Sequence, residues 1–248
     1  MNDTAASSPD WASWADTVTQ TLHLAVAPIA ISFRSEASDE PPAFDEPLSD
    51  PTPDGRRGRV PAGCVFWIRA VDRSFTTTPA DHGNCSVGSF THGLLSLEEA
   101  AGHSDVAALL EAGWVDEAAI ASVPSLKTRP AAIVYGPLAE TTAAPDVVLL
   151  RVNGRQLMVL SDAIPGLRIE GKPQCHIVAL AHEQGVVAAS VGCALSRART
   201  GMRPDEMTVA IPGPRLAEVV DGVVRTAAVD TVVAKYAAED ARRFAASA

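Results

Sequence analysis

The sequence has few basic residues for its length, and fewer basic than acidic ones. Its 248 residues include 20 Lys and Arg against 30 Asp and Glu, so the formal net charge at pH 7 is −10. Nucleic-acid binding depends on clustered basic side chains that neutralise phosphates. The composition therefore argues against a nucleic-acid partner.

Long apolar runs are also missing. No apolar stretch approaches the ~20 residues that a membrane-spanning helix needs. The first residues, MNDTAASSPDWASWAD, lack the basic and apolar regions of a secretory signal peptide. We therefore expect a cytoplasmic protein with no membrane partner. With 47% hydrophobic and 20% charged residues, the composition is that of a globular chain.

Closely spaced cysteine pairs are absent as well. The four cysteines are Cys64, Cys85, Cys175 and Cys193, and no spacing matches a C-x-x-C, zinc-finger or ferredoxin pattern. In the cytoplasm they are expected to be thiols or metal ligands, because structural disulfides are rare there. Scattered cysteines are commonly buried apolar thiols, and that interpretation stays open beside the metal interpretation.

The apolar, β-branched segments predict the fold. Between them lie segments with helical periodicity, including an amphipathic pattern over 214–225. Strands and helices do not alternate strictly, so we predict an α+β (mixed α/β) fold with flanking helices and one central mixed sheet. The sheet is expected to have about five strands, at residues 25–33, 131–136, 146–152, 186–192 and 206–211.

One segment differs in character from the rest. Residues 36–58 are rich in Pro, Asp and Glu and poor in apolar residues. Such a composition buries too little apolar area to offset chain entropy. We predict a single domain over residues 1–248 that carries a mobile acidic, Pro-rich loop at about 36–58, with a lid over a site as the alternative.

Three of the cysteines stand at the ends of predicted elements. Cys193 follows the short strand VVAASVG and precedes the helical segment ALSRART, where backbone N–H groups would lower the pKa of its thiol. Cys85 lies in a turn after Asp-His-Gly-Asn, and Cys175 opens an element after Lys-Pro-Gln. Thiols at the ends of elements can converge on one site, whereas thiols in the middle of elements mostly pack.

Four stretches together resemble a known family. They are Cys64 to Ala70, the turn with Cys85, Gly88 and Phe90, the segment PDVVLLRVNGRQLMVL, and the segment VGCALSRARTGMRPDEMTVAIPG. This combination resembles the bacterial and archaeal family called "domain of unknown function 169" (DUF169) over roughly residues 20–225. The resemblance implies a single-domain cytoplasmic protein whose matching positions include all four cysteines, and it implies no activity. The chain departs from the family pattern at Ala194-Leu195-Ser196, where a glycine-containing turn is commoner.

A shared set of four cysteines favours a common metal site. Four thiolates suit an iron–sulfur cluster, with tetrahedral zinc as the alternative. Zinc ribbons usually present their ligands as close pairs, so ligands spread over the fold fit a cluster better. We therefore predict that Cys64, Cys85, Cys175 and Cys193 are metal ligands. The predicted function is redox or electron transfer with a small-molecule substrate or redox partner, and an iron–sulfur-dependent oxidoreductase is a candidate activity.

Histidines and arginines near the cysteines are further candidates. His82 and His92 flank Cys85 and could replace a ligand or act as a general base, or simply face solvent in a turn. Arg197 and Arg199 are the predicted cofactor-binding residues, because guanidinium groups could offset the charge of a thiolate-ligated cluster. Salt bridges to Asp205 and Glu206 are the alternative role of this arginine cluster.

Two other functions remain open. One is an enzyme without metal, in which Cys193 or Cys85 is the nucleophile and His82 or His92 the base. The other is a small-molecule binding or accessory protein with structural cysteines.

Overall fold

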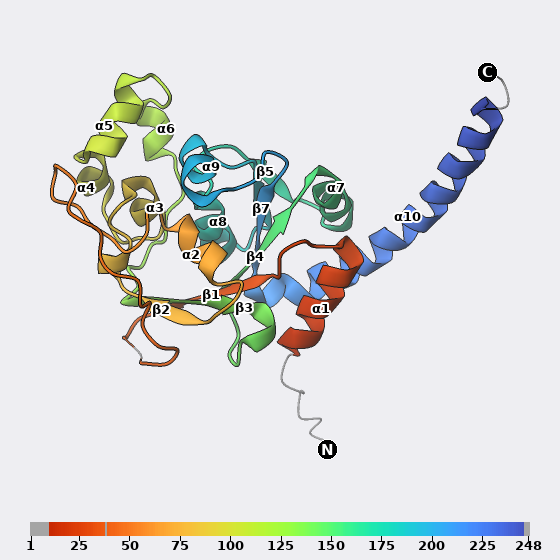
Figure 1. The fold of residues 1–248 in the computed structure, drawn as a ribbon, viewed down its shortest axis with the longest axis horizontal. Helices are drawn as coiled ribbons and strands as arrows, with labels where there is room; N and C mark the ends of the chain where they lie inside the picture. Colours follow the sequence, from red (N-terminus) through yellow and green to blue (C-terminus); the bar gives the residue numbers. More distant parts are fainter. Residues whose placement is uncertain (1–9, 38, 246–248) are drawn as a thin grey trace, which may run out of the picture.

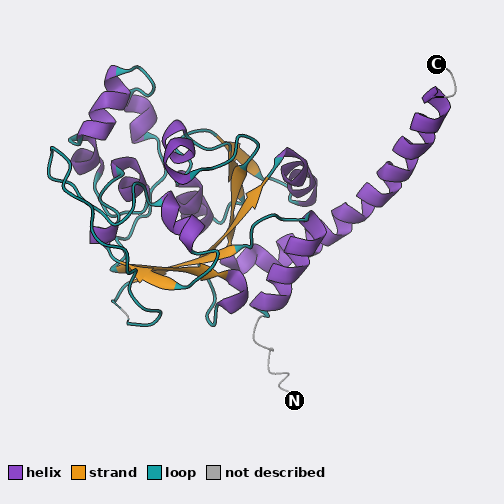
Figure 2. Cartoon of the chain, in the orientation of Figure 1, coloured by secondary structure: helices purple, strands orange, loops and turns teal. Residues whose placement is uncertain are grey.

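A single seven-stranded sheet forms the centre of the protein (Figures 1 and 2). The computed structural model describes residues 10–37 and 39–245. The strand order is β2-β3-β1-β4-β7-β6-β5. The strands are β1 (Ile29–Arg34), β2 (Phe75–Thr77), β3 (Ala132–Pro137), β4 (Val147–Val152), β5 (Arg168–Glu170), β6 (Ala188–Ser190) and β7 (Met207–Pro212).

The pairing confirms the predicted mixed α/β class. β5 and β6 pair in parallel, and the other neighbours pair antiparallel. All five predicted strand segments lie in this one sheet. The two additional strands, β2 and β5, have three residues each and form the two edges. Strands this short carry too few alternating residues to be recognised from periodicity.

The two faces of the sheet bury alternate residues of the same strands. In β4, Val148 and Leu150 contribute to one hydrophobic core, and Val147 and Leu149 to the other. Because successive side chains of a strand point to opposite faces, both faces must be covered. Helices α1 (Trp11–Leu22), α7 (Gly154–Ala163) and α10 (Leu216–Ala245) cover the first face. Helices α2 (Cys64–Arg69) and α8 (His176–Gln184) cover the second.

Five further helices lie on the side of α2 and α8 (Figure 1). They are α3 (Ser86–Thr91), α4 (Leu97–Ala101), α5 (Ser104–Glu111), α6 (Glu117–Ala121) and α9 (Ala194–Thr200). Three single 3₁₀ turns, η1 (Pro79–Asp81), η2 (Leu138–Glu140) and η3 (Gly213–Arg215), connect elements. Contacts join α3 to α8 and α2 to α9. This side of the sheet therefore gathers the helices that carry the cysteines.

The acidic segment 36–58 is held to the rest of the fold at several points; Arg56, for example, pairs with Asp105 at 3.3 Å. Most of its side chains are exposed or half-buried, but Phe44 is only 3% exposed and packs against Phe66 and Phe75. An isolated bridge pairs Ala43 with Thr76. Gly58 is buried and the Arg56 side chain is only 10% exposed, so the segment lies only partly on the surface; its mobility remains a prediction.

Across residues 10–37 and 39–245, no helix combines the length and the apolar character that a membrane span requires.

Candidate metal centre

The four cysteines line one cavity. Each comes from the start of a different helix: Cys64 is the first residue of α2, whereas Cys85, Cys175 and Cys193 are the N-cap residues of α3, α8 and α9. Three of these helices start after a loop, and α9 starts just after strand β6. Residues more than a hundred positions apart in the sequence thus meet through the packing of α2, α3, α8 and α9.

The cavity is small and its other walls are mostly apolar. Its volume is about 40 Å³. Besides the cysteines, the apolar side chains that line it include Val87, Leu109, Trp114, Pro173 and Leu195. Such walls keep water away from the sulfurs, which matters for any charge placed there.

Burial controls the acidity of three of the thiols. Burial, together with smaller contributions from the neighbouring Cys85 and Cys193, raises the pKa of Cys64 to about 12. Burial likewise raises the pKa of Cys85, and it raises that of Cys175 well above its ordinary value. Repulsion from the other three cysteines adds to the rise of the pKa at Cys175. Without a cation beside them, Cys64, Cys85 and Cys175 stay protonated at neutral pH.

Two side chains tie the segments of the site together. The Arg199 guanidinium donates to the carbonyl oxygens of Pro61 and Asn84, at 3.2 and 3.4 Å, just before Cys64 and Cys85 in the chain. Its positive charge also lowers the pKa of both thiols, although burial outweighs that effect. The Oγ of Ser196 donates to Oε1 of Gln174 at 3.0 Å, which joins the Cys193 segment to the Cys175 segment.

Arg197 and Arg203 have different surroundings from Arg199. The Arg197 guanidinium donates to the carbonyl oxygens of Val191, Arg203, Pro204 and Glu206. It thereby fixes the loop after β6 on the loop before β7. Arg203 pairs with Asp205 at 3.4 Å. Of the two predicted cofactor-binding residues, Arg199 is therefore the one whose positive charge lowers the pKa of cysteine thiols in the site.

The alternative of solvent-facing histidines is wrong for both His82 and His92, which are each 2% exposed. Nε2 of His82 is 3.0 Å from the Thr77 hydroxyl. Nδ1 of His92 lies 2.9 Å from the Gly88 carbonyl and donates to it, and the ring lines the cysteine cavity. Burial lowers both pKa values, that of His82 well below the ordinary range. His176 is also buried, with Nε2 3.4 Å from a carboxylate oxygen of Glu170.

The donor geometry of a metal site is not already assembled. In residues 10–37 and 39–245, no group of three or more His, Cys, Asp or Glu side chains is placed to hold a metal ion directly. The chemistry of the donor set still fits a metal, because four sulfurs surround one dry cavity. Ligation would need the cysteine side chains to move towards one another.

Sequence reasoning did not find several residues of this site. Gln174, Trp114 and Leu109 line the cavity, yet none lies in a recognisable motif. The position of Gln174 directly before Cys175 was the one available signal.

The family comparison fits this geometry. The family model DUF169, described as "Uncharacterised ArCR", matches residues 17–222. The chain belongs to the DUF169 family. The matched range includes all four cysteines and every strand of the sheet, and it ends within the packed first turns of α10. No curated protein and no solved structure matches the chain.

Proposed function

We propose that this DUF169 protein binds an iron–sulfur cluster through Cys64, Cys85, Cys175 and Cys193 and acts in redox or electron-transfer chemistry on a small metabolite. The observation that supports it best is the meeting of four cysteines from four helices at one mostly apolar cavity. The chain has no other cysteine. Chance burial of thiols in a core would not require them to meet.

The acidity of the thiols supports a cationic occupant. Raised pKa values mean that ionising the cysteines costs free energy unless a positive charge lies between them. Metal binding supplies that charge and releases the protons. When bound, a cluster supplies one-electron transfer. The chain's own residues hold it, exclude water through Val87, Leu109 and Trp114, and offset thiolate charge through Arg199.

Two comparisons favour this proposal over its alternatives. Structural zinc sites usually draw ligands from close pairs, whereas these four come from separate helices. A cysteine nucleophile needs an accessible thiolate with a nearby base. Burial raises the pKa of the Cys85 thiol, and Nε2 of the candidate base His82 already bonds to the Thr77 hydroxyl, whereas Nε2 of His92 has no partner among the described residues.

Anaerobic purification followed by absorption spectroscopy and iron and sulfide analysis tests the proposal. The expected result is a brown protein with broad absorption near 400 nm. Replacing any one cysteine with Ser should remove most of the iron and lower the thermal stability, because metal binding is coupled to folding.

Val87→Ala is the matched control, since it changes the same cavity wall without removing a sulfur. It should keep its iron. A colourless protein with zinc bound to the same cysteines would favour the zinc alternative. A protein that takes up no metal after reconstitution would refute both.

A further inference from the structure

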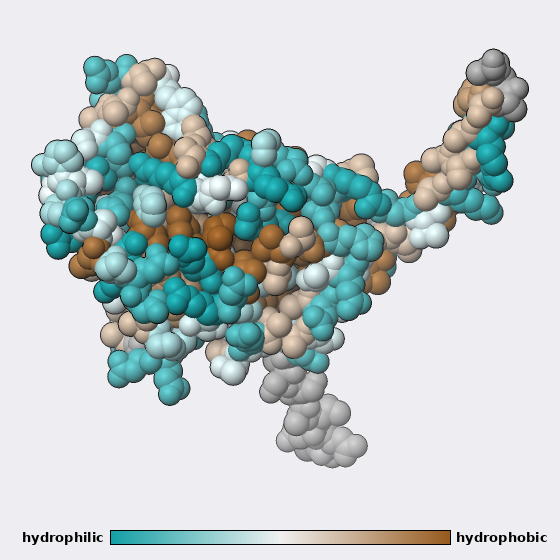
Figure 3. Space-filling view, viewed as in Figure 1, coloured by the Kyte–Doolittle hydropathy of each residue, from teal (hydrophilic) through white to brown (hydrophobic). Residues whose placement is uncertain are grey.

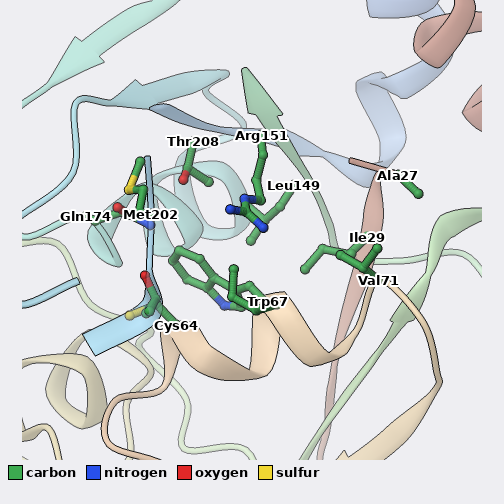
Figure 4. Close-up of a pocket in the computed structure, with 12 residues that line it drawn as sticks. Ala27, Ile29, Cys64, Trp67, Val71, Leu149, Arg151, Gln174, Met202 and Thr208 are labelled. Atoms are coloured by element: carbon green, nitrogen blue, oxygen red, sulfur yellow. The ribbon is translucent and has the colours of Figure 1, made fainter. Parts of the chain in front are cut away.

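A second pocket lies against Cys64, between helix α2 and the sheet (Figure 4). Arg151 and Leu149 extend from β4 toward the indole ring of Trp67 on α2. Gln174 and Met202 close the end near Cys64, and Ala27 lies at the opposite end. We infer that this pocket binds the carbonyl oxygen of a small neutral molecule with an apolar body.

Several side chains that line the pocket carry hydrogen-bond donors. Nε1 of Trp67 is buried and has no hydrogen-bond partner among the described residues, although buried N–H groups are normally paired. Arg151 uses Nε and Nη2 to bind Glu206, which leaves Nη1 for another acceptor. Gln174 accepts from Ser196 with Oε1, so its amide group has N–H donors to offer. The Thr208 hydroxyl completes the set.

Charge decides which kind of acceptor fits. Glu206, whose side chain is 6% exposed, holds Arg151 in a two-pronged ion pair, so the guanidinium charge is offset. The remaining donors are neutral. The rest of the wall is largely apolar and includes Ile29, Ile68, Val71 and Leu149. A neutral carbonyl group, as in a ketone or an amide, meets such donors without bringing an unbalanced charge into the pocket.

The small volume of the pocket determines where the rest of the bound molecule lies. The cavity volume is about 20 Å³, which holds a group about the size of one water molecule. The carbonyl oxygen can enter while the apolar body rests on the rim formed by Ala27, Ile68 and Val71. Figure 3 shows apolar surface in the middle of this face of the molecule.

The pocket adjoins the cysteine cavity, because Cys64 and Gln174 line both. The claim that a redox substrate binds in this pocket rests on the proposed function. The claim that a carbonyl compound binds there rests only on the donors and apolar walls just described.

Nuclear magnetic resonance on the ¹⁵N-labelled full chain tests the inference, with 2-butanone as the probe and acetate as its charged counterpart. The four tryptophans give four indole N–H signals, and Trp67→Phe identifies the one from Trp67. Butanone should shift that signal in a saturable manner and leave the signals of Trp11 and Trp14 in place. Acetate should bind at least tenfold more weakly.

Two variants remove single donors: Thr208→Val keeps the shape of the side chain, and Trp67→Phe keeps an aromatic ring at the position. Trp67→Phe and Thr208→Val should each weaken butanone binding about three- to tenfold, the usual worth of one neutral hydrogen bond. Trp14→Phe, on α1 across the sheet, is the matched control and should bind as the native chain does. Binding of butanone that both pocket variants leave unchanged, or no binding at all, would overturn the inference and leave an ordered water as the occupant.

Iron and sulfide analysis of the same samples separates the two proposals. Butanone binding in a protein without iron would keep the pocket and remove the redox role. A brown protein that does not bind butanone would do the reverse.

Discussion

Burial at the level of single residues gives His82 and His92 an unusual acid–base behaviour. Both rings are 2% exposed and stay neutral because burial lowers their pKa values. The unfolded chain would bind a proton at each histidine near pH 6.5. Since the folded pKa values lie below that, the histidines favour the folded state fully above about pH 6.5, and their contribution is lost as the pH falls toward the folded pKa.

The first prediction follows for the metal-free chain. Between pH 7.0 and 5.5, His82 alone should reduce the free energy of unfolding by about 1 kcal/mol. Urea unfolding at the two pH values measures it, and His82→Gln should remove about that much of the pH dependence. His23→Asn is the control, because His23 is exposed and lies in the left-handed region, which Asn tolerates. Equal pH dependence in the His82 variant and the native chain would contradict the argument.

At the level of secondary-structure elements, the sequence predicts where the site cysteines stand at helix starts better than it predicts which helices pack together. The sequence placed Cys85, Cys175 and Cys193 at element ends, and they are N-cap residues of three helices. Local signals such as a turn or a strand ending at Gly192 are enough for that. The residues that line the second pocket could not be predicted from the sequence. Trp67, Arg151 and Gln174 come from α2, β4 and the segment before α8, and they meet only in the folded chain.

The same distinction holds for the strands. Five strands were predicted from apolar, β-branched runs. Four of them bury residues in both hydrophobic cores, and β3 contributes Ile133 and Tyr135 to one. β5 was missed because all three of its residues are exposed or half-buried, so hydrophobicity gives no signal there. Its place in the sheet comes from parallel pairing with β6, which is a tertiary effect.

Helices α5 and α6 are the elements that we expect to open most easily. α6 buries no residue and α5 buries only Val106, whereas α8 buries six. Few buried contacts mean a low free energy of local opening. In hydrogen-exchange mass spectrometry, peptides from 104–121 should therefore exchange at least tenfold faster than peptides from 176–184. Similar rates in both segments would show that α5 and α6 are held by contacts outside the hydrophobic core.

The region of α5 and α6 also forms part of the wall of the cysteine cavity. Leu109 and Trp114 of this region line the cysteine cavity. Opening of α5 and α6 would therefore expose the sulfurs to solvent and give a small molecule or a metal a path to them.

At the scale of the whole molecule, only the first turns of α10 help to cover the sheet. Leu216, Val219, Val220 and Val223 are buried against the sheet, and Gly222 lies so close to Ala163 that an added Cβ would come within 2.9 Å of its carbonyl oxygen. Beyond these turns the helix projects away from the body (Figure 1). Its distal half exposes Val229, Val232, Val233, Tyr236 and Phe244. The family match, which ends at residue 222, covers the packed part and not the projecting part.

The last prediction separates the two parts of α10. A chain that ends after Val229 keeps every buried residue of the helix. It loses the exposed ion pair of Arg155 with Asp230, in which Arg155 is 59% exposed, and the exposed pair of Arg243 with Asp240, which lies wholly within the removed part. Exposed pairs contribute about 0–1 kcal/mol, so the free energy of unfolding should change by no more than about 1 kcal/mol. A chain that ends after Arg215 also loses the four buried side chains, each worth about 1.5–3 kcal/mol. That loss is as large as the whole stability of a typical domain. Thermal unfolding should thus be cooperative for the first chain and absent for the second, and a large destabilisation of the first would mean that the projecting half supports the fold through contacts with another molecule.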